Sequence, residues 1–293
     1  MPIKHSKFDR FLLVLNAIGL AFAVLIVVVP LIYVVVASFM DPSVLLSRGL
    51  SFNVKDWTLD GYEKILTNPA MVRGFGNAVL YSTSFALITV TVSVFAGYAL
   101  SDHRLVGRRI FMTLFLITMF FGGGLVPTYL LVKELGMIDT VWAVIIPGAV
   151  NVWNIILSRT FFKGVPNELR EAANVDGASE AMIFFRIVLP LSKPIVFVLA
   201  LYAFVGQWNA YFDAMIYLDN PNLHPLQLVL RSILIQNQVD PSMIADQLAM
   251  AEMKRLSEMI KYAAIVISSL PLVVMYPFFQ KYFEKGVMVG SLK

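Results

Sequence analysis

Two short helices joined at a glycine are predicted by residues 165–190, which read VPNELREAANVDGASEAMIFFRIVLP. Asn167 suits a helix start, and Gly177 suits the left-handed conformation in which many helices end. A second helix is expected from Ser179 to about Leu189, where the following proline should end it.

On both sides of this segment the chain is dominated by long apolar runs. Of its 293 residues, 58% are hydrophobic and 14% are charged, whereas about a quarter of an ordinary soluble domain is charged. A helix needs roughly 20 mainly apolar residues to cross a hydrocarbon core of about 30 Å. We therefore predict an all-α membrane protein with six transmembrane helices. The six runs are residues 14–39, 75–100, 110–132, 138–158, 194–217 and 263–280. Kinks are expected at Pro30 in the first run and at Gly122–Gly124 in the third.

The distribution of basic residues predicts which loops face the cytoplasm. The two tails and the 101–109 and 159–193 loops hold 14 of the 23 Lys and Arg residues. The opposite side holds 12 of the 19 acids, ten in its loops and two, Asp139 and Asp213, within the neighbouring runs. Because Lys and Arg accumulate on the cytoplasmic side, both termini are predicted to be cytoplasmic. The predicted organisation is a tail at 1–13, a membrane domain at 14–280 with outer loops at 40–74 and 218–262, and a tail at 281–293.

Composition argues against several other functions. The net charge of +4 forms no continuous basic patch, so nucleic acid is not an expected partner. The chain has no cysteine and three separated histidines, His5, His103 and His224. Neither a catalytic site nor a metal site is predicted.

The alanines in the loop point to contact with another protein. Ala172 and Ala173 are small enough to let a short helix seat deeply in a partner's cleft, and Arg170 and Glu171 offer charge pairing at its rim. From these residues alone, an amphipathic helix resting on the membrane surface is the favoured interpretation.

The same segment resembles the EAA loop of ABC importer permeases. The resemblance rests on Glu171-Ala172-Ala173, on Gly177 and on Ile187-Val188-Leu189-Pro190. It implies a type I ABC importer permease fold in which this loop is the coupling helix that docks on an ATP-hydrolysing subunit. The coupling residues implied are Arg170, Glu171, Ala172, Ala173, Asp176 and Gly177.

Other matches indicate a carbohydrate-uptake branch of the family. The chain resembles the second membrane subunit of maltose-type and oligosaccharide-type importers at Gln207–Phe212 and Tyr276–Val287. It departs from that pattern at Ala210, where many relatives are acidic, and at Val287–Val289, where smaller residues are common. Further matches are Val126–Leu131, Leu135–Thr140, Pro147 and Pro166–Leu169.

The resemblance also implies partners and a location. No Gly-x-x-x-x-Gly-Lys-Ser/Thr motif occurs in the chain, so ATP and Mg²⁺ are expected on two partner ATPase subunits and no cofactor on this chain. The other expected partners are a homologous second permease subunit, an extracytoplasmic sugar-binding protein and membrane lipid. The implied location is the bacterial plasma (inner) membrane.

A sugar path through the membrane needs polar groups and aromatic faces that point into the helix bundle. The candidates are Asn77, Tyr81, Ser84, Asn151, Asn154, Gln207, Trp208, Asn209, Tyr211 and Asp213. Each has a competing structural role, because polar side chains also join membrane helices, and Trp208 and Tyr211 also suit an interfacial aromatic belt. Asp213 is expected to face an aqueous cavity or the sugar-binding protein. The principal sugar contacts can also lie on the companion subunit.

The expected function is sugar translocation driven by ATP hydrolysis on partner subunits. An oligosaccharide is the expected cargo, with an acidic, alginate-like chain as the specific hypothesis. The alternatives are another polar solute carried by a permease of the same family, an ion-coupled secondary transporter, and a membrane scaffold without transport. Copurification with an ATPase bound through the loop would support a permease of this family, whether for sugar or for another polar solute. It would argue against an ion-coupled transporter and against a scaffold.

Overall fold

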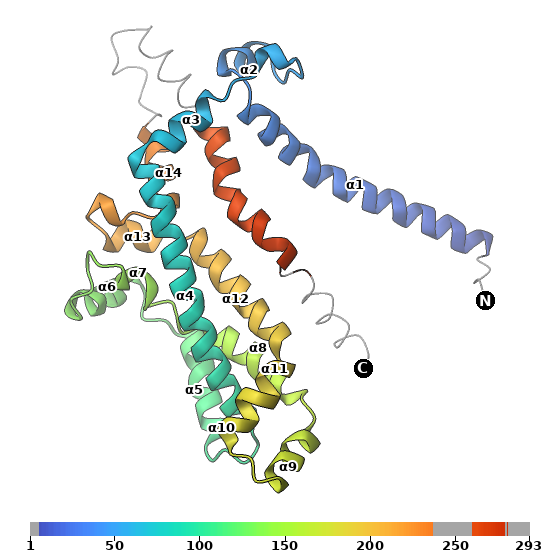
Figure 1. The fold of residues 1–293 in the computed structure, drawn as a ribbon, viewed down its shortest axis with the longest axis vertical. Coiled ribbons are helices and arrows are strands. Elements are labelled where there is room, and N and C mark those ends of the chain that lie inside the picture. The colour runs from blue at the N-terminus through green and yellow to red at the C-terminus, as the bar shows by residue number, and fades with distance from the viewer. Residues whose placement is uncertain (1–5, 237–259, 279, 281–293) are drawn as a thin grey trace. The chain divides into compact units, whose positions relative to one another are not determined.

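The computed structural model describes residues 6–236, 260–278 and 280, and within them helices are the only extended regular elements (Figure 1). The all-α prediction is confirmed. The helices are α1 (Lys7–Ser38), α2 (Pro42–Arg48), α3 (Asp60–Thr67), α4 (Pro69–Ser101), α5 (Arg108–Phe120), α6 (Leu125–Glu134), α7 (Trp142–Ile145), α8 (Val152–Lys163), α9 (Asn167–Val175), α10 (Glu180–Ile183), α11 (Leu189–Leu191), α12 (Lys193–Trp208), α13 (Phe212–Tyr217), α14 (Leu226–Gln236) and a helix at Ile260–Phe278. Short 3-10 turns occur at Val54–Asp56 and Pro221–Leu223, and a π segment occurs at Phe184–Val188.

One compact unit contains residues 6–68, 233–236 and 260–269. Its helix α1 starts with a capping box, in which Ser6 and Asp9 each accept a hydrogen bond from the other's backbone N–H (3.1 and 2.9 Å). The helix stays continuous through Pro30, where the sequence predicted a kink. Within this unit its apolar side chains are exposed along nearly the whole length. That surface needs lipid or another protein to cover it.

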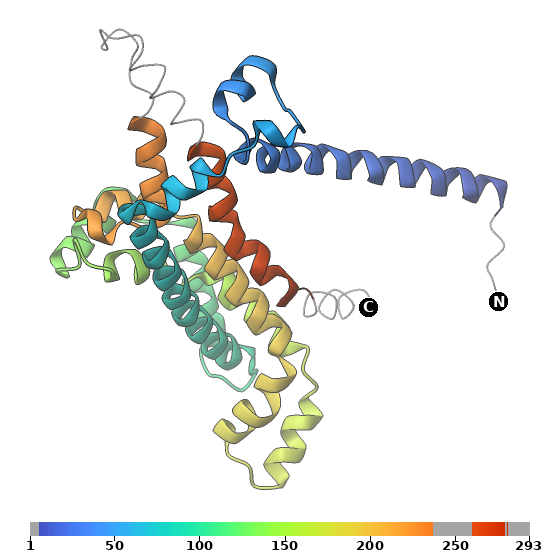
Figure 2. The same ribbon diagram turned by 45° about the horizontal axis from the view of Figure 1, so that its top comes forward.

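The second unit, residues 69–232 with 270–278 and 280, is built around α4, which packs on α8 and α12 (Figure 2). Small residues make this packing close. A Cβ atom at Gly97 would lie 2.5 Å from the Oγ atom of Ser158 on α8, so only glycine fits there. Small buried residues continue along α4 at Ala78, Ser82, Ala86, Thr89 and Ser93.

The predicted six spans are only partly reproduced. In the described part of the chain three helices, Lys7–Ser38, Pro69–Ser101 and Ile260–Phe278, are long and apolar enough to cross a membrane. The number rises to at most five if each of two bent helix pairs is one span. The predicted third span, 110–132, is α5 and α6 at an angle of 111°, broken at the glycine run. Within the described residues, the predicted fourth span, 138–158, is α7 followed by a non-helical turn and the start of α8.

The predicted loop helices form with one difference. Helix α9 starts at Asn167 and ends before Gly177, whose φ of 77° is left-handed as predicted. The second helix starts after Ser179, but Pro190 does not end it, because the proline lies within α11. The chain instead bends by 76° between α11 and α12, at Ser192. The predicted tail at 281–293 and residues 237–259 of the predicted 218–262 loop lie outside the described residues.

Candidate functional site

Helix α9 turns one face toward the chain's own core and leaves the opposite face open. Ala173 is 8% exposed and packs in a cluster with Val94 of α4 and Phe184 of the π segment. Ala172 is exposed, and Val175 is 88% exposed. The two adjacent alanines therefore differ: Ala173 anchors α9 to its own chain, and Ala172 lies on the surface that a partner can reach.

The end of α9 is fixed by backbone hydrogen bonds around Gly177. The N–H of Ala178 donates to the carbonyl of Ala173 (2.9 Å), and the N–H of Gly177 donates to that of Asn174 (3.1 Å). Asp176 and Gly177 themselves are exposed. This rigid turn holds the open face of α9 in one orientation.

Charged side chains connect the α9–α10 loop to the end of α4. The Arg104 guanidinium lies 2.8 Å from an Asp102 carboxylate oxygen and 2.9 Å from one of Glu180 on α10. Tyr98 of α4 donates its hydroxyl to Glu180 (3.3 Å). Hydrogen bonding from Arg104 lowers the pKa of Asp102 to about 2. The loop is thus tied to α4 by a network in addition to its apolar contacts.

Arg170 belongs to this connection rather than to the open face. Its guanidinium carbon lies 4.5 Å from the centre of the Tyr98 ring, and the side chain is half-buried. A cation over an aromatic face at this distance is attracted by about 0.5–2 kcal/mol. Glu171 is exposed. Of the two residues predicted to pair with charges on a partner protein, Glu171 is therefore the one that lies at the surface. Docking through either residue stays a prediction.

Two predicted sugar contacts on α4 are engaged within the chain. Asn77 donates from Nδ2 to the carbonyls of Asn222 (2.8 Å) and His224 (3.0 Å), and the Tyr81 hydroxyl donates to the carbonyl of Leu223 (2.8 Å). These bonds hold the turn before α14 against α4. A sugar would have to compete with them.

Three other predicted residues meet in one pocket between α4, α8 and α12. Its volume is about 360 Å³. Its lining residues are Phe85, Asn151, Trp153, Asn154, Tyr202, Ala203, Gly206 and Gln207. Sequence reasoning missed the aromatic members Phe85, Trp153 and Tyr202. The available signal was local: Trp153 directly precedes Asn154, and Tyr202 lies five residues before Gln207 on one helix.

The remaining candidates of the Gln207–Asp213 cluster do not line this pocket. Trp208 is 1% exposed and packs on Phe75 and Phe204. It is therefore a core residue, which disagrees with the interfacial-belt alternative. Asn209 donates from Nδ2 to the carbonyl of Val205 (2.9 Å), at the end of α12.

The break after α12 separates the last candidates from the pocket. The centre of the Tyr211 ring lies 5.2 Å from the guanidinium carbon of Arg231. Asp213 is exposed on α13. Among the described residues, no ion-pair partner of Asp213 is found. Ser84 is half-buried on α4. Their predicted sugar contacts stay predictions.

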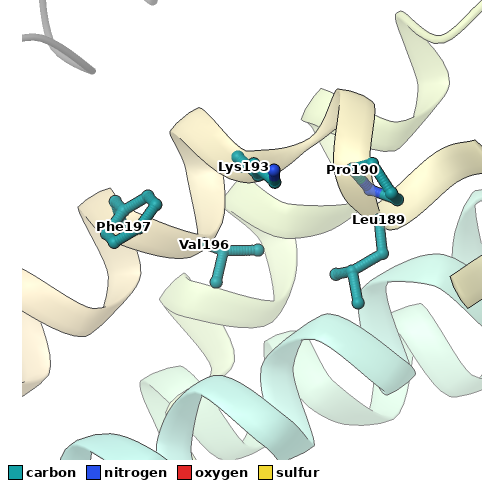
Figure 3. Close-up of a pocket in the computed structure, with 5 residues that line it drawn as sticks. All are labelled: Leu189, Pro190, Lys193, Val196 and Phe197. Carbon is teal, nitrogen blue, oxygen red and sulfur yellow. The ribbon is translucent and has the colours of Figure 1, made fainter.

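A second, more apolar groove lies at the bend between α11 and α12 (Figure 3). It has a volume of about 370 Å³ and is lined by Leu189, Pro190, Lys193, Val196 and Phe197. Lys193 is its one charged side chain. In the described part of the chain, no group of three or more His, Cys, Asp or Glu side chains could hold a metal ion.

Comparison with known proteins gives consistent matches over almost the whole chain. Residues 104–289 match the family described as binding-protein-dependent transport system inner membrane component. Protein LplC of Bacillus subtilis strain 168 is 36% identical over 99% of this chain and 97% of its own length. The polygalacturonan/rhamnogalacturonan transport system permease protein YtcP of the same organism is 36% identical over 99% of this chain and 100% of its own length.

The fold is also similar to that of a solved structure. A chain of a bacterial ABC transporter involved in the import of the acidic polysaccharide alginate superposes with a TM-score of 0.84. It is 29% identical in sequence, and the match covers 96% of this chain and 99% of that one. The predicted permease family is confirmed: this chain belongs to the inner membrane components of binding-protein-dependent transport systems and is a permease subunit, not an enzyme.

Proposed function

We propose that this chain is the translocation subunit of an ATP-driven importer of oligosaccharides, coupled to its motor through α9. The observation that carries the proposal is the two-sided character of α9. Ala173 is buried against α4 and the π segment, whereas Ala172 and Glu171 are exposed. A motor protein that grips the open face can therefore pull on α4 through the buried face.

The surrounding assembly is part of the proposal. The chain pairs with a homologous permease subunit, receives sugar from an extracytoplasmic binding protein, and contacts two ATPases that hold ATP and Mg²⁺. Six spans with both termini in the cytoplasm of a bacterial plasma membrane place the 159–193 loop next to those ATPases. The basic-residue bias supports this orientation.

An oligosaccharide is the cargo class that the relatives support. YtcP is named for polygalacturonan and rhamnogalacturonan, and the superposed structure belongs to an alginate importer. An ion-coupled transporter would need coupling carboxylates inside the membrane. The single carboxylate among the path candidates, Asp213, is exposed on the short helix α13.

The proposal is tested by adding charge to the open face of α9. Ala172→Arg places a long cation on the exposed surface without entering the core. When Ala172→Arg is expressed together with its partner subunits, we expect sugar uptake and sugar-stimulated ATP hydrolysis to fall at least tenfold, and the ATPase to be lost on copurification. Ala181→Arg adds the same charge at an exposed position on α10 and should retain both activities.

The two variants show whether the ATPase docks on the open face of α9. Loss of the ATPase in Ala172→Arg with retention in Ala181→Arg supports docking on α9. Wild-type levels of uptake and ATPase binding in Ala172→Arg would contradict it. A wild-type complex that transports no oligosaccharide would contradict the cargo assignment instead.

A further inference from the structure

The pocket between α4, α8 and α12 contains a buried amide with unused hydrogen-bonding capacity. Asn154 is 7% exposed, and its side-chain amide has no hydrogen-bond partner among the described residues. Leaving a buried polar group without a partner costs about 1–3 kcal/mol. A ligand or water that enters the pocket can satisfy the Asn154 amide.

Two neighbouring amides add to this capacity. The Nε2 atom of Gln207 donates to the carbonyl of Val144 at 3.4 Å, which is long for a hydrogen bond, and its Oε1 atom stays available. The Oδ1 atom of Asn151 accepts from the backbone N–H of Asn154 (3.1 Å), which leaves its NH₂ group available. Donors and acceptors thus occur side by side, as hydroxyl groups require because each hydroxyl both donates and accepts.

Aromatic side chains supply the apolar part of the lining. Trp153 is 56% exposed and Tyr202 is 54% exposed, although both line the pocket. Phe85 is half-buried on α4. Open aromatic faces beside amides suit a ligand with C–H-rich faces and hydroxyl-bearing edges. A sugar ring has both.

The lining is uncharged, which restricts the ligand further. None of the eight lining residues is Asp, Glu, Lys, Arg or His. A carboxylate in this pocket would lose hydration without meeting a cation, and burial of an unpaired charge is costly. Hydroxyl groups carry no such cost when amides pair with them.

We propose that this pocket is a subsite for one uncharged ring of the transported oligosaccharide. The proposal rests on the oligosaccharide importer function proposed above. The volume of about 360 Å³ lies at the lower end of the range of roughly 300–1,000 Å³ for ligand sites. Carboxylates of an acidic chain would have to bind elsewhere along the path.

Gly206 allows the subsite to be blocked without disturbing the backbone. A Cβ atom added there would meet no heavy atom within 4 Å, and Gly206 lines the pocket. Gly206→Leu therefore fills the pocket. Gly76→Leu is the matched control, because Gly76 also lies within a helix with nothing within 4 Å and is not in the lining. Asn154→Ala removes the unpartnered amide.

The experiment measures uptake of two radiolabelled probes, galactotriose and trigalacturonate, by the complete complex in liposomes. We expect Gly206→Leu to lower galactotriose uptake at least tenfold and Asn154→Ala to raise its KM about five- to tenfold, with Gly76→Leu unchanged. Basal ATP hydrolysis should stay normal in all variants. This reports that the complex is folded and assembled.

Three other results would overturn the subsite, its preference for an uncharged ring, or the proposed function. Normal galactotriose uptake by both pocket variants would overturn the subsite while leaving oligosaccharide import intact. Pocket variants that impair trigalacturonate uptake but not galactotriose uptake would overturn the assignment to an uncharged ring. Absence of uptake of both probes by the wild-type complex would count against the proposed function and, with it, this subsite.

Discussion

The Arg104 guanidinium lies 2.9 Å from the Glu180 carboxylate, which joins the loop after α4 to the start of α10. The two side chains are 57% and 59% exposed, and exposed ion pairs contribute about 0–1 kcal/mol. Removing the pair should therefore change overall stability little. Because it joins the α9–α10 loop to α4, we expect a larger effect on coupling.

Glu180→Gln is expected to lower sugar uptake per ATP hydrolysed about two- to fivefold, with a thermal unfolding midpoint close to that of the wild type. Parallel uptake and ATPase assays on the reconstituted complex measure this ratio. If the pair acts as a unit, Arg104→Gln combined with Glu180→Gln should be no worse than the more damaging of the two single changes. Additive losses in the double variant would show that the two residues act separately.

Asp102 should make stability sensitive to strong acid. Arg104 lowers its pKa from 3.8 to about 2, so the folded state favours the ionised form. Its stabilising contribution is present above about pH 4 and is lost as the pH falls toward 2. Unfolding of detergent-solubilised protein across this window should be less pH-dependent in Asp102→Asn. An unchanged pH profile would disagree with this role.

The absence of cysteine makes the predicted topology directly testable. A single cysteine introduced at any position is therefore the one thiol of the chain. Val106, in the 101–109 loop, is 91% exposed, and Val54, in the 40–74 loop, is 73% exposed. A membrane-impermeant maleimide applied to intact cells should label Val54→Cys, whereas Val106→Cys should react only after lysis. The reverse pattern would invert the proposed orientation.

The close contact of α4 with α8 should make Gly97 intolerant of a methyl group. The added Cβ atom would lie 2.5 Å from the Oγ and 2.6 Å from the Cβ of Ser158. Overpacking of this kind costs typically 1–3 kcal/mol, so Gly97→Ala should lower the unfolding midpoint. Gly76→Ala should leave it unchanged or raise it slightly, because nothing lies within 4 Å there. Equal stability of the two variants would contradict the packing argument.

Local signals explain what the sequence predicted well. Gly177 was expected to end α9 in the left-handed region, and that conformation depends on the residue itself. The apolar runs correctly indicated a membrane environment. They gave no information on whether each run forms one unbroken helix. Hydropathy indicates that a residue prefers an apolar environment, but it does not show where a helix is interrupted. Breaks at Gly122–Gly124, in the turn after α7 and at Asn209–Tyr211 therefore divided three predicted spans.

Contacts between distant segments explain what the sequence could not predict. Asn77 and Tyr81 have the spacing of a polar helix face, but their partners are carbonyls about 140 residues further along the chain. Asn151, Asn154 and Gln207 were identified as polar candidates from the sequence. Only the packing of α4, α8 and α12 brings all three into one pocket. The sequence shows the chemical type of each side chain, but not which distant residues lie beside it in the folded chain.

The small-residue packing around α4 has a mechanical consequence. The hydroxyl oxygens of Ser82, Thr89, Ser93 and Ser158 are buried without hydrogen-bond partners among the described residues. Over this stretch the four hydroxyls add no directional bonds that would have to break when α4 slides along its neighbours. The Arg159 Nε–H of α8 does donate to the carbonyl of Leu100, at the end of α4 (3.0 Å). We therefore expect α4 to shift lengthwise past its neighbours at little enthalpic cost, as shear motions between packed helices require.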